Sequence, residues 1–141
     1  MPPTIQAHEA KDKFVAMLLS KRSDFYRPNS RRDWYVSKDG DTHIFITFSC
    51  SAELWYDMDE TDLQELQLKK KGFVVFLLGS SDRFLSVPVR EIYTRLSQHT
   101  AGLTENKRYT FRVHDAGASV RFIQLPSWEL REYLNNLDFL K

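Results

Sequence analysis

Gly72 and Gly79 enclose an unbroken apolar run, residues 73–78. Such a run is too short to cross a membrane or to form a typical buried helix. It is rich in β-branched and aromatic residues, which favour strands, and it lacks the polar alternation of a strand with one exposed face. The run therefore predicts the central strand of a sheet, with helices covering both of its faces.

Alternating apolar and polar positions predict further strands, joined by turns that contain glycine. The clearest turn is Asp39-Gly40, a pair typical of a two-residue type I′ hairpin loop. In the strand that follows, Ile44, Ile46 and Phe48 share one face, which we expect to be the core face. The strands predicted besides the central one are 34–37, 42–48, 83–87, 109–113 and 119–125, with a short strand within 50–58 that runs through residues 54–56.

Sequence patterns typical of helix starts lie before, between and after these strands. Thr4 is a suitable N-cap for an apolar stripe, and Pro88 and Pro126 each suit the first turn of a helix. Asp59 or Thr61 is the candidate N-cap of the second predicted helix. Gln64, three residues after Thr61, would complete a capping box, and the segment has acids at its start and lysines at its end. The predicted helices are 5–20, 61–70, 88–102 and 126–137.

This order of elements predicts a single α+β domain over residues 1–141, with a flexible N-terminus at residues 1–4. Short loops and glycine-containing hairpins favour antiparallel pairing over repeated parallel crossovers. We expect a mainly antiparallel mixed sheet of about six or seven strands, with about three to four helices packed against it. A chain of 141 residues with 42% hydrophobic content is long enough for one sizeable core.

Charge and cysteine content narrow the classes of function. With 20 basic and 19 acidic residues, the net charge exerts no overall attraction on nucleic acid or on an anionic membrane, so such a contact must come from a local patch. Cys50 is the single cysteine and excludes an intramolecular disulfide, and the N-terminal residues lack the apolar core of a signal peptide. We expect a soluble, cytoplasmic protein that does not contact a membrane.

An acidic cluster at residues 57–62 is the candidate metal site. Asp57 and Asp59 imitate the start of a calcium loop, but Asp62 stands where such a loop needs glycine and Leu68 where it needs a bidentate acid. Helix capping and the helix dipole explain these acids without a metal. We therefore predict no metal, and we keep Asp57 and Asp59 as a weak alternative.

Signatures of catalysis are also weak. A nuclease of the restriction-enzyme class needs an acid at the end of one strand and an acid-x-Lys pair in the next. Asp57 would supply the first acid, but the strand at 73–78 holds no acid or lysine. The histidines have no ligand spacing, and a nucleophile pair of Cys50 with His43 rests on sequence proximity alone. We predict no catalytic residue and no cofactor.

Basic and aromatic residues gather at residues 21–35, which we call the basic-aromatic segment. Its arginines are suited to contact phosphates while an aromatic ring stacks on an unpaired base. The same composition suits a solvated loop with its aromatic rings folded inward. Arg83, Arg112 and Arg121, on predicted strands, either extend this basic patch or face solvent. The candidate contacts in the segment are Arg22, Tyr26, Arg27, Arg31, Arg32, Trp34 and Tyr35.

Two aromatic pairs suggest a different class of function. Trp55 with Tyr56, and Trp128 with Tyr133, are residue types enriched at the centres of protein interfaces. Either pair is therefore a candidate anchor for a second subunit.

No family motif is evident in these residues. We expect a small, non-enzymatic, cytoplasmic binding domain that contacts nucleic acid or a protein partner through the basic-aromatic segment. One alternative is a metal-dependent phosphodiesterase or nuclease that uses the acids at 57–62. The other is a homo-oligomeric interaction or structural protein, for example a homodimer.

Overall fold

The structure is a computed structural model that describes residues 3–28, 33–49, 54–98, 108–123 and 125–140. These residues form three α-helices, seven strands and two short 3-10 helices, and the fold is α+β as predicted. The helices are α1 (Pro3–Lys21), α2 (Glu60–Gln67), α3 (Val89–Gln98), η1 (Arg131–Tyr133) and η2 (Asp138–Leu140). The strands are β1 (Trp34–Val36), β2 (Thr42–Ser49), β3 (Leu54–Asp59), β4 (Lys71–Ser80), β5 (Arg83–Pro88), β6 (Arg108–Asp115) and β7 (Val120–Phe122).

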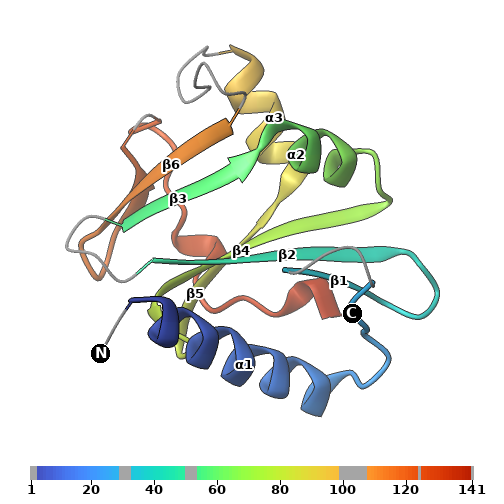
Figure 1. Ribbon diagram of the computed structural model, residues 1–141. Coiled ribbons are helices and arrows are strands. Elements are labelled where there is room, and N and C mark those ends of the chain that lie inside the picture. Colours follow the sequence, from blue (N-terminus) through green and yellow to red (C-terminus); the bar gives the residue numbers. More distant parts are fainter. Residues whose placement is uncertain (1–2, 29–32, 50–53, 99–107, 124, 141) are drawn as a thin grey trace.

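The strands of the described residues form two sheets instead of the single sheet that the sequence predicts (Figure 1). Sheet A has the order β1-β2-β4-β5, and sheet B has the order β3-β6-β7. Neighbouring strands are antiparallel except β2 and β4, which are parallel. This parallel pair arises because the chain leaves sheet A after β2, contributes β3 to sheet B and returns through α2.

Strand β4 is the predicted central strand, and it is buried on both faces. Val74 and Phe76 point into a core between the two sheets, to which α2 and α3 also contribute. Val75 and Leu77 point the other way, into a second core beneath α1. Figure 1 shows α1 on one side of sheet A and sheet B on the other. The prediction that helices cover both faces of this strand is therefore correct for the face that packs against α1. The opposite face is covered by sheet B together with α2 and α3.

The hairpin of β1 and β2 forms where it was predicted, but its loop is different. The Ser37 N–H donates to the Thr42 carbonyl at 2.9 Å, so residues 38–41 form a four-residue loop. Gly40 has a φ of 78°, whereas Asp39 does not have the positive φ that a type I′ turn requires. Side chains account for the difference, since the Asp39 carboxylate accepts hydrogen bonds from the Ser37 hydroxyl and the Asp41 N–H. The predicted core face of β2 is confirmed for Ile44 and Ile46, which are buried.

Helix α2 begins at Glu60, with Asp59 as the N-cap, and it ends three residues earlier than predicted. The predicted capping box is wrong, because no side chain caps this helix and Gln64 donates to the Glu60 carboxylate instead, at 3.0 Å. The acids of the first turn suit the positive end of the helix dipole. The helix stops after Gln67 because strand β4 starts at Lys71.

The predicted terminal helix at 126–137 does not form. Its backbone groups bond to strands instead: the Leu130 N–H donates to the Val120 carbonyl at 2.8 Å, and the Asn135 N–H donates to the Phe84 carbonyl at 2.7 Å. Asn135 also has a φ of 51°, which a continuous α-helix does not allow. The segment therefore crosses from β7 to β5 as irregular chain with the two short turns η1 and η2.

The other two predicted helices form. Helix α1 begins at Pro3, so residues 3 and 4, which were expected to be flexible, are helical. Helix α3 covers the first part of the predicted range 88–102, and residues 99–107 lie outside the described part of the chain. No helix among the described residues has the length and apolar content required to pass through a bilayer.

Candidate binding surfaces

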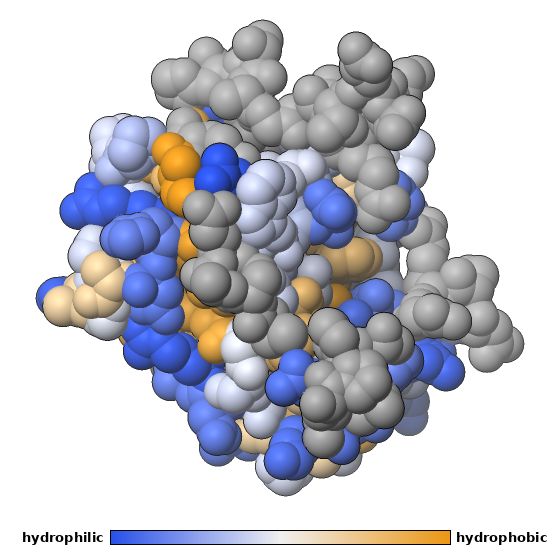
Figure 2. Space-filling view, turned by 60° about the vertical axis from the view of Figure 1, so that its left-hand side comes forward, coloured by the Kyte–Doolittle hydropathy of each residue, from blue (hydrophilic) through white to orange (hydrophobic). Residues whose placement is uncertain are grey.

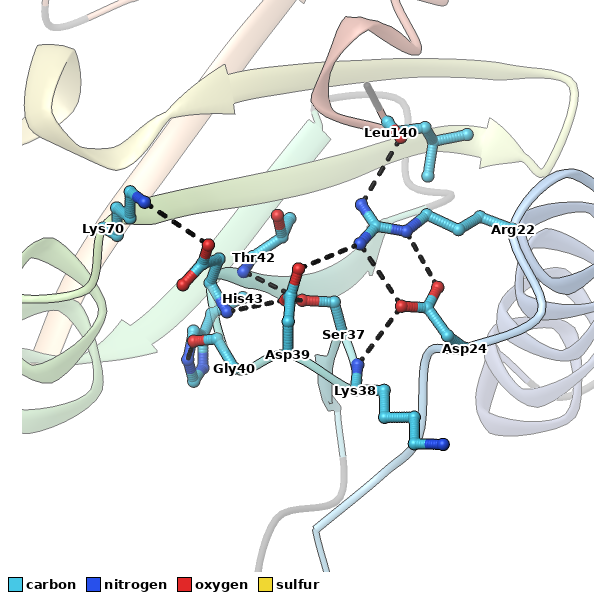
Figure 3. A network of polar contacts seen from close by, with 11 residues as sticks. Arg22, Asp24, Ser37, Lys38, Asp39, Gly40, Thr42, His43, Lys70 and Leu140 are labelled. Atoms are coloured by element: carbon cyan, nitrogen blue, oxygen red, sulfur yellow. Dashed lines mark hydrogen bonds and ion pairs between the residues drawn. The ribbon is translucent and has the colours of Figure 1, made fainter.

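Arg22, the first arginine of the basic-aromatic segment, lies in a network of polar contacts (Figure 3). Its Nε donates to the Asp24 carboxylate at 2.8 Å, its Nη2 lies 3.6 Å from the Asp39 carboxylate, and its Nη1 donates to the Leu140 carbonyl at 3.4 Å. The bond from Arg22 holds the pKa of Asp24 below its ordinary value. Arg22 thus joins the end of α1, the hairpin loop and the C-terminal segment, which is a structural role.

Trp34 is only 3% exposed, and its indole N–H donates to Nδ1 of His43 at 3.0 Å. Because Nδ1 accepts this bond, Nε2 carries the ring hydrogen and donates to the Gly40 carbonyl at 3.0 Å. The Trp34 ring is therefore buried and cannot stack on a base in this conformation. Tyr35 is half-buried against the second core, and burial raises the pKa of its hydroxyl.

The burial of His43 predicts how the stability of the fold depends on pH. Burial lowers the pKa of His43 below its ordinary value of 6.5. The hydrogen bond to the Gly40 carbonyl opposes this shift in part, the nearby charge of Lys69 lowers the pKa further, and that of Glu65 raises it. The unfolded chain then binds the proton first as pH falls. His43 therefore stabilises the fold fully above 6.5, and this contribution is lost as pH falls below that value.

Urea unfolding from about pH 7 to about pH 5 measures this effect. We expect His43→Asn to cost about 1 kcal/mol at the upper pH, through the lost hydrogen bonds. We also expect its stability to fall less steeply with decreasing pH than that of the wild type. The exposed His8, replaced in the same way, is the matched control. Identical pH slopes for wild type and His43→Asn would contradict the lowered pKa of His43.

The exposed part of the basic-aromatic segment is small. Tyr26 is 53% exposed, and Arg27 beside it is also exposed. Two backbone hydrogen bonds of 2.9 Å join Tyr26 to Val36, on the edge of β1. Arg31 and Arg32 lie outside the described residues. Among the described residues of the predicted set, Tyr26 and Arg27 are therefore the two whose side chains are exposed and can contact a ligand.

The acids of the candidate metal site do not converge. Asp57 and Asp59 lie on β3, and Asp57 accepts a hydrogen bond of 2.9 Å from the Thr110 hydroxyl. Within the described residues, no three His, Cys, Asp or Glu side chains come close enough together to hold a metal ion. Cys50, the proposed partner of His43, lies outside the described residues. The phosphodiesterase alternative needs converging carboxylates, so this arrangement does not support it.

Strands β3, β6 and β7 present a second surface, on the outer face of sheet B. Trp55 pairs with Arg112, and Arg112 accepts a backbone hydrogen bond from Ile123, so these residues form one row across β3, β6 and the residue that follows β7. His114 and Arg121 form the next row. We call the five residues Trp55, Arg112, His114, Arg121 and Ile123 the sheet B platform.

The platform is exposed because the opposite face of the same strands makes the core. Trp55 is 48% exposed and Ile123 is 42% exposed, whereas Tyr56, between the two sheets, is 2% exposed. The Arg112 guanidinium lies 4.5 Å from the centre of the Trp55 ring. Strand alternation on β3 predicts this outward set, but the pairing of Trp55 with Arg112 requires the register of β3 against β6. His114 and Ile123 were not singled out from the sequence for the same reason.

The other predicted surface residues have inward roles. Tyr56 donates to the Leu77 carbonyl at 2.7 Å, so it links the two sheets. Trp128 is 5% exposed, and the Arg95 guanidinium lies 4.2 Å from the centre of its ring. Tyr133 is half-buried beside Trp128. Of the four aromatic residues in the two proposed interface pairs, Trp55 is therefore the one that is exposed.

Arg83, at the start of β5, links the two sheets and does not extend either surface. Its guanidinium donates to both carboxylate oxygens of Asp115, at 2.8 and 2.7 Å, and to the Gly117 carbonyl at 3.1 Å. These bonds hold the pKa of Asp115 below its ordinary value. The pair joins the start of β5 in sheet A to the end of β6 in sheet B.

Comparisons of this chain with protein families, with curated proteins and with solved structures find no match.

Proposed function

We propose that this chain is a non-enzymatic, cytoplasmic binding domain that contacts single-stranded nucleic acid through the exposed part of the basic-aromatic segment. The observation that carries the proposal is the position of Tyr26, which is exposed and held by two backbone hydrogen bonds on the edge of sheet A, with the exposed Arg27 beside it. The single cysteine supports a reducing compartment. In sequence, Arg31 and Arg32 extend the basic character of the segment.

The chemistry of these residues suits the binding of single-stranded nucleic acid. An arginine that neutralises a phosphate releases condensed counterions, and an aromatic ring stacks on any unpaired base. The backbone at Tyr26 is already ordered by Val36, so binding does not have to order it. Because the net charge is nearly balanced, binding must come from a local patch such as this one.

Fluorescence anisotropy of a labelled oligothymidylate, titrated at several salt concentrations, tests the proposal. We expect Tyr26→Ala to weaken binding about tenfold, through the lost stacking. We expect Arg27→Ala, and the double variant of Arg31 and Arg32 to alanine, to weaken binding and to reduce the salt slope by about 1 for each arginine in contact with a phosphate. Arg90→Ala removes an exposed arginine from α3 and is the matched control.

Three other outcomes would overturn the proposal. Wild-type affinity in all the segment variants would exclude this surface. A sedimentation coefficient that rises with protein concentration, without binding to the oligonucleotide, would favour the homo-oligomer. Metal-dependent cleavage of the oligonucleotide, lost in Asp57→Asn, would favour the phosphodiesterase.

A further inference from the structure

The sheet B platform is an exposed face of an antiparallel sheet that combines an aromatic ring with basic side chains. Figure 2 views the molecule with the side that carries sheet B in Figure 1 turned forward, and it shows a strip of hydrophobic residues with hydrophilic residues along one side. Trp55 and Ile123, at the two ends of one row, are among the most exposed large hydrophobic residues of the described chain.

We infer that the sheet B platform is a second surface for single-stranded nucleic acid, on which an unpaired base stacks on Trp55. Arg112 supports this role, because its guanidinium lies 4.5 Å from the ring centre while 48% of Trp55 remains exposed. The arginine therefore restrains the indole and leaves part of it open to a ligand. A restrained ring loses little conformational entropy when a base stacks on it.

The charges on the sheet B platform indicate the direction in which a single-stranded nucleic acid crosses it. Arg112, His114 and Arg121 occupy two adjacent rows at the Trp55 end, whereas Asp57 and Asp59 lie along β3 toward its other end. A polyanion is repelled from those carboxylates. The nucleic acid therefore follows the row from Trp55 through Arg112 to Ile123. This row crosses β-strands that lie about 4.8 Å apart, and it is roughly 10 Å long in all.

Arg121 is already positioned for this path. Its Nε donates to the Ser119 hydroxyl at 3.0 Å, its Nη1 donates to the Pro126 carbonyl at 2.7 Å, and its Nη2 lies 3.7 Å from the Glu129 carboxylate. These contacts hold the guanidinium toward the segment at residues 126–129, whereas the backbone of Arg121 pairs with His114. A phosphate next to the stacked base would take the place of the Glu129 carboxylate at Nη2, and it would then gain a charged hydrogen bond from a side chain that is already ordered.

The occupant is a single strand because a duplex keeps its bases paired and cannot offer one to Trp55. A protein partner would also use a tryptophan and an arginine, but two adjacent rows with three basic residues match a phosphate backbone better than an average protein surface. This surface lies on sheet B and the basic-aromatic segment lies on the edge of sheet A, so the inference does not depend on the proposed function.

Intrinsic tryptophan fluorescence is the test, because Trp34 and Trp128 are buried and Trp55 is exposed. We expect unlabelled oligothymidylate to quench the emission of the wild type, and the matching duplex to quench it much less. Trp55→Leu keeps an apolar side chain but cannot stack, and we expect it to weaken binding of the labelled oligonucleotide about tenfold. Trp55→Phe should retain most of the affinity, and Arg121→Gln should reduce the salt slope by about 1. Arg90→Gln is the charge-matched control.

Affinity and salt slope unchanged from the wild type in Trp55→Leu and Arg121→Gln would overturn the inference. So would a change in sedimentation coefficient in Trp55→Leu with no change in oligonucleotide binding, because it would mark the platform as a protein interface. If the Tyr26 and Arg27 variants lose binding while the platform variants keep it, the proposed function stands and this inference fails. The reverse pattern supports the platform and rejects the segment.

Discussion

Replacement of Phe76 by alanine is expected to lower the free energy of unfolding by about 3–5 kcal/mol, the usual cost of removing a large buried aromatic side chain. Phe76 is fully buried on β4, in the core between the two sheets. Its ring makes edge contacts with Tyr56, Phe111 and Phe122, at centroid distances of 5.0 to 5.5 Å. All three partners belong to sheet B, so the alanine would leave a cavity where the two sheets meet.

Urea unfolding of the purified variant measures this loss. Phe73→Ala is the matched control, because Phe73 lies on the same strand, is half-buried and has one close ring contact described, with Phe139 at 5.5 Å. We expect it to cost clearly less than Phe76→Ala. Phe76→Leu should recover much of the stability by refilling the cavity. Equal midpoints for wild type and Phe76→Ala would contradict the position of β4 between the two cores.

Gly72→Ala is expected to destabilise the protein by about 2–3 kcal/mol, although alanine normally suits a strand better than glycine. A Cβ atom at this position would lie 2.5 Å from the backbone carbonyl oxygen of Leu66 and 2.9 Å from Cγ1 of Val89. The first contact is with backbone at the end of α2, so a rotamer change cannot relieve it. The methyl group would instead force α2 away from the start of β4.

Gly40→Ala separates this steric effect from the loss of glycine itself. Gly40 has a φ of 78°, and an added Cβ would meet nothing within 4 Å, so its cost is conformational and about 1 kcal/mol. Urea unfolding should therefore place Gly72→Ala below Gly40→Ala in stability. A Gly72→Ala variant that unfolds at or above the wild-type midpoint would show that α2 and β4 are not so closely packed.

Much of the fold could be predicted from local patterns. The apolar run at 73–78 predicts a strand buried on both faces, and the spacing of Ile44 and Ile46 predicts the core face of β2, because both signals depend on the residues of one strand alone. The division into two sheets could not be predicted. It depends on β3 pairing with β6, about fifty residues later in the chain. The predicted terminal helix was wrong for a similar reason, since Val120 and Phe84 accept its backbone hydrogen bonds.

The candidate surfaces were harder to predict than the fold. The composition of the basic-aromatic segment does not reveal that Arg22 bonds to Asp24 and to the C-terminal segment, or that Trp34 turns inward to His43. Such roles depend on tertiary contacts. Trp55 was identified from its residue type, but its partner Arg112 required the register of two strands that are distant in sequence.

Binding of the wild-type chain to a single-stranded oligonucleotide, measured as a function of salt concentration, tests the central claim most directly. The account predicts that a labelled oligothymidylate binds at low salt, that the affinity falls linearly on a logarithmic salt scale, and that the matching duplex binds more weakly. The account would be contradicted if the single-stranded oligonucleotide does not bind at low salt, or if it and the duplex bind with equal affinity.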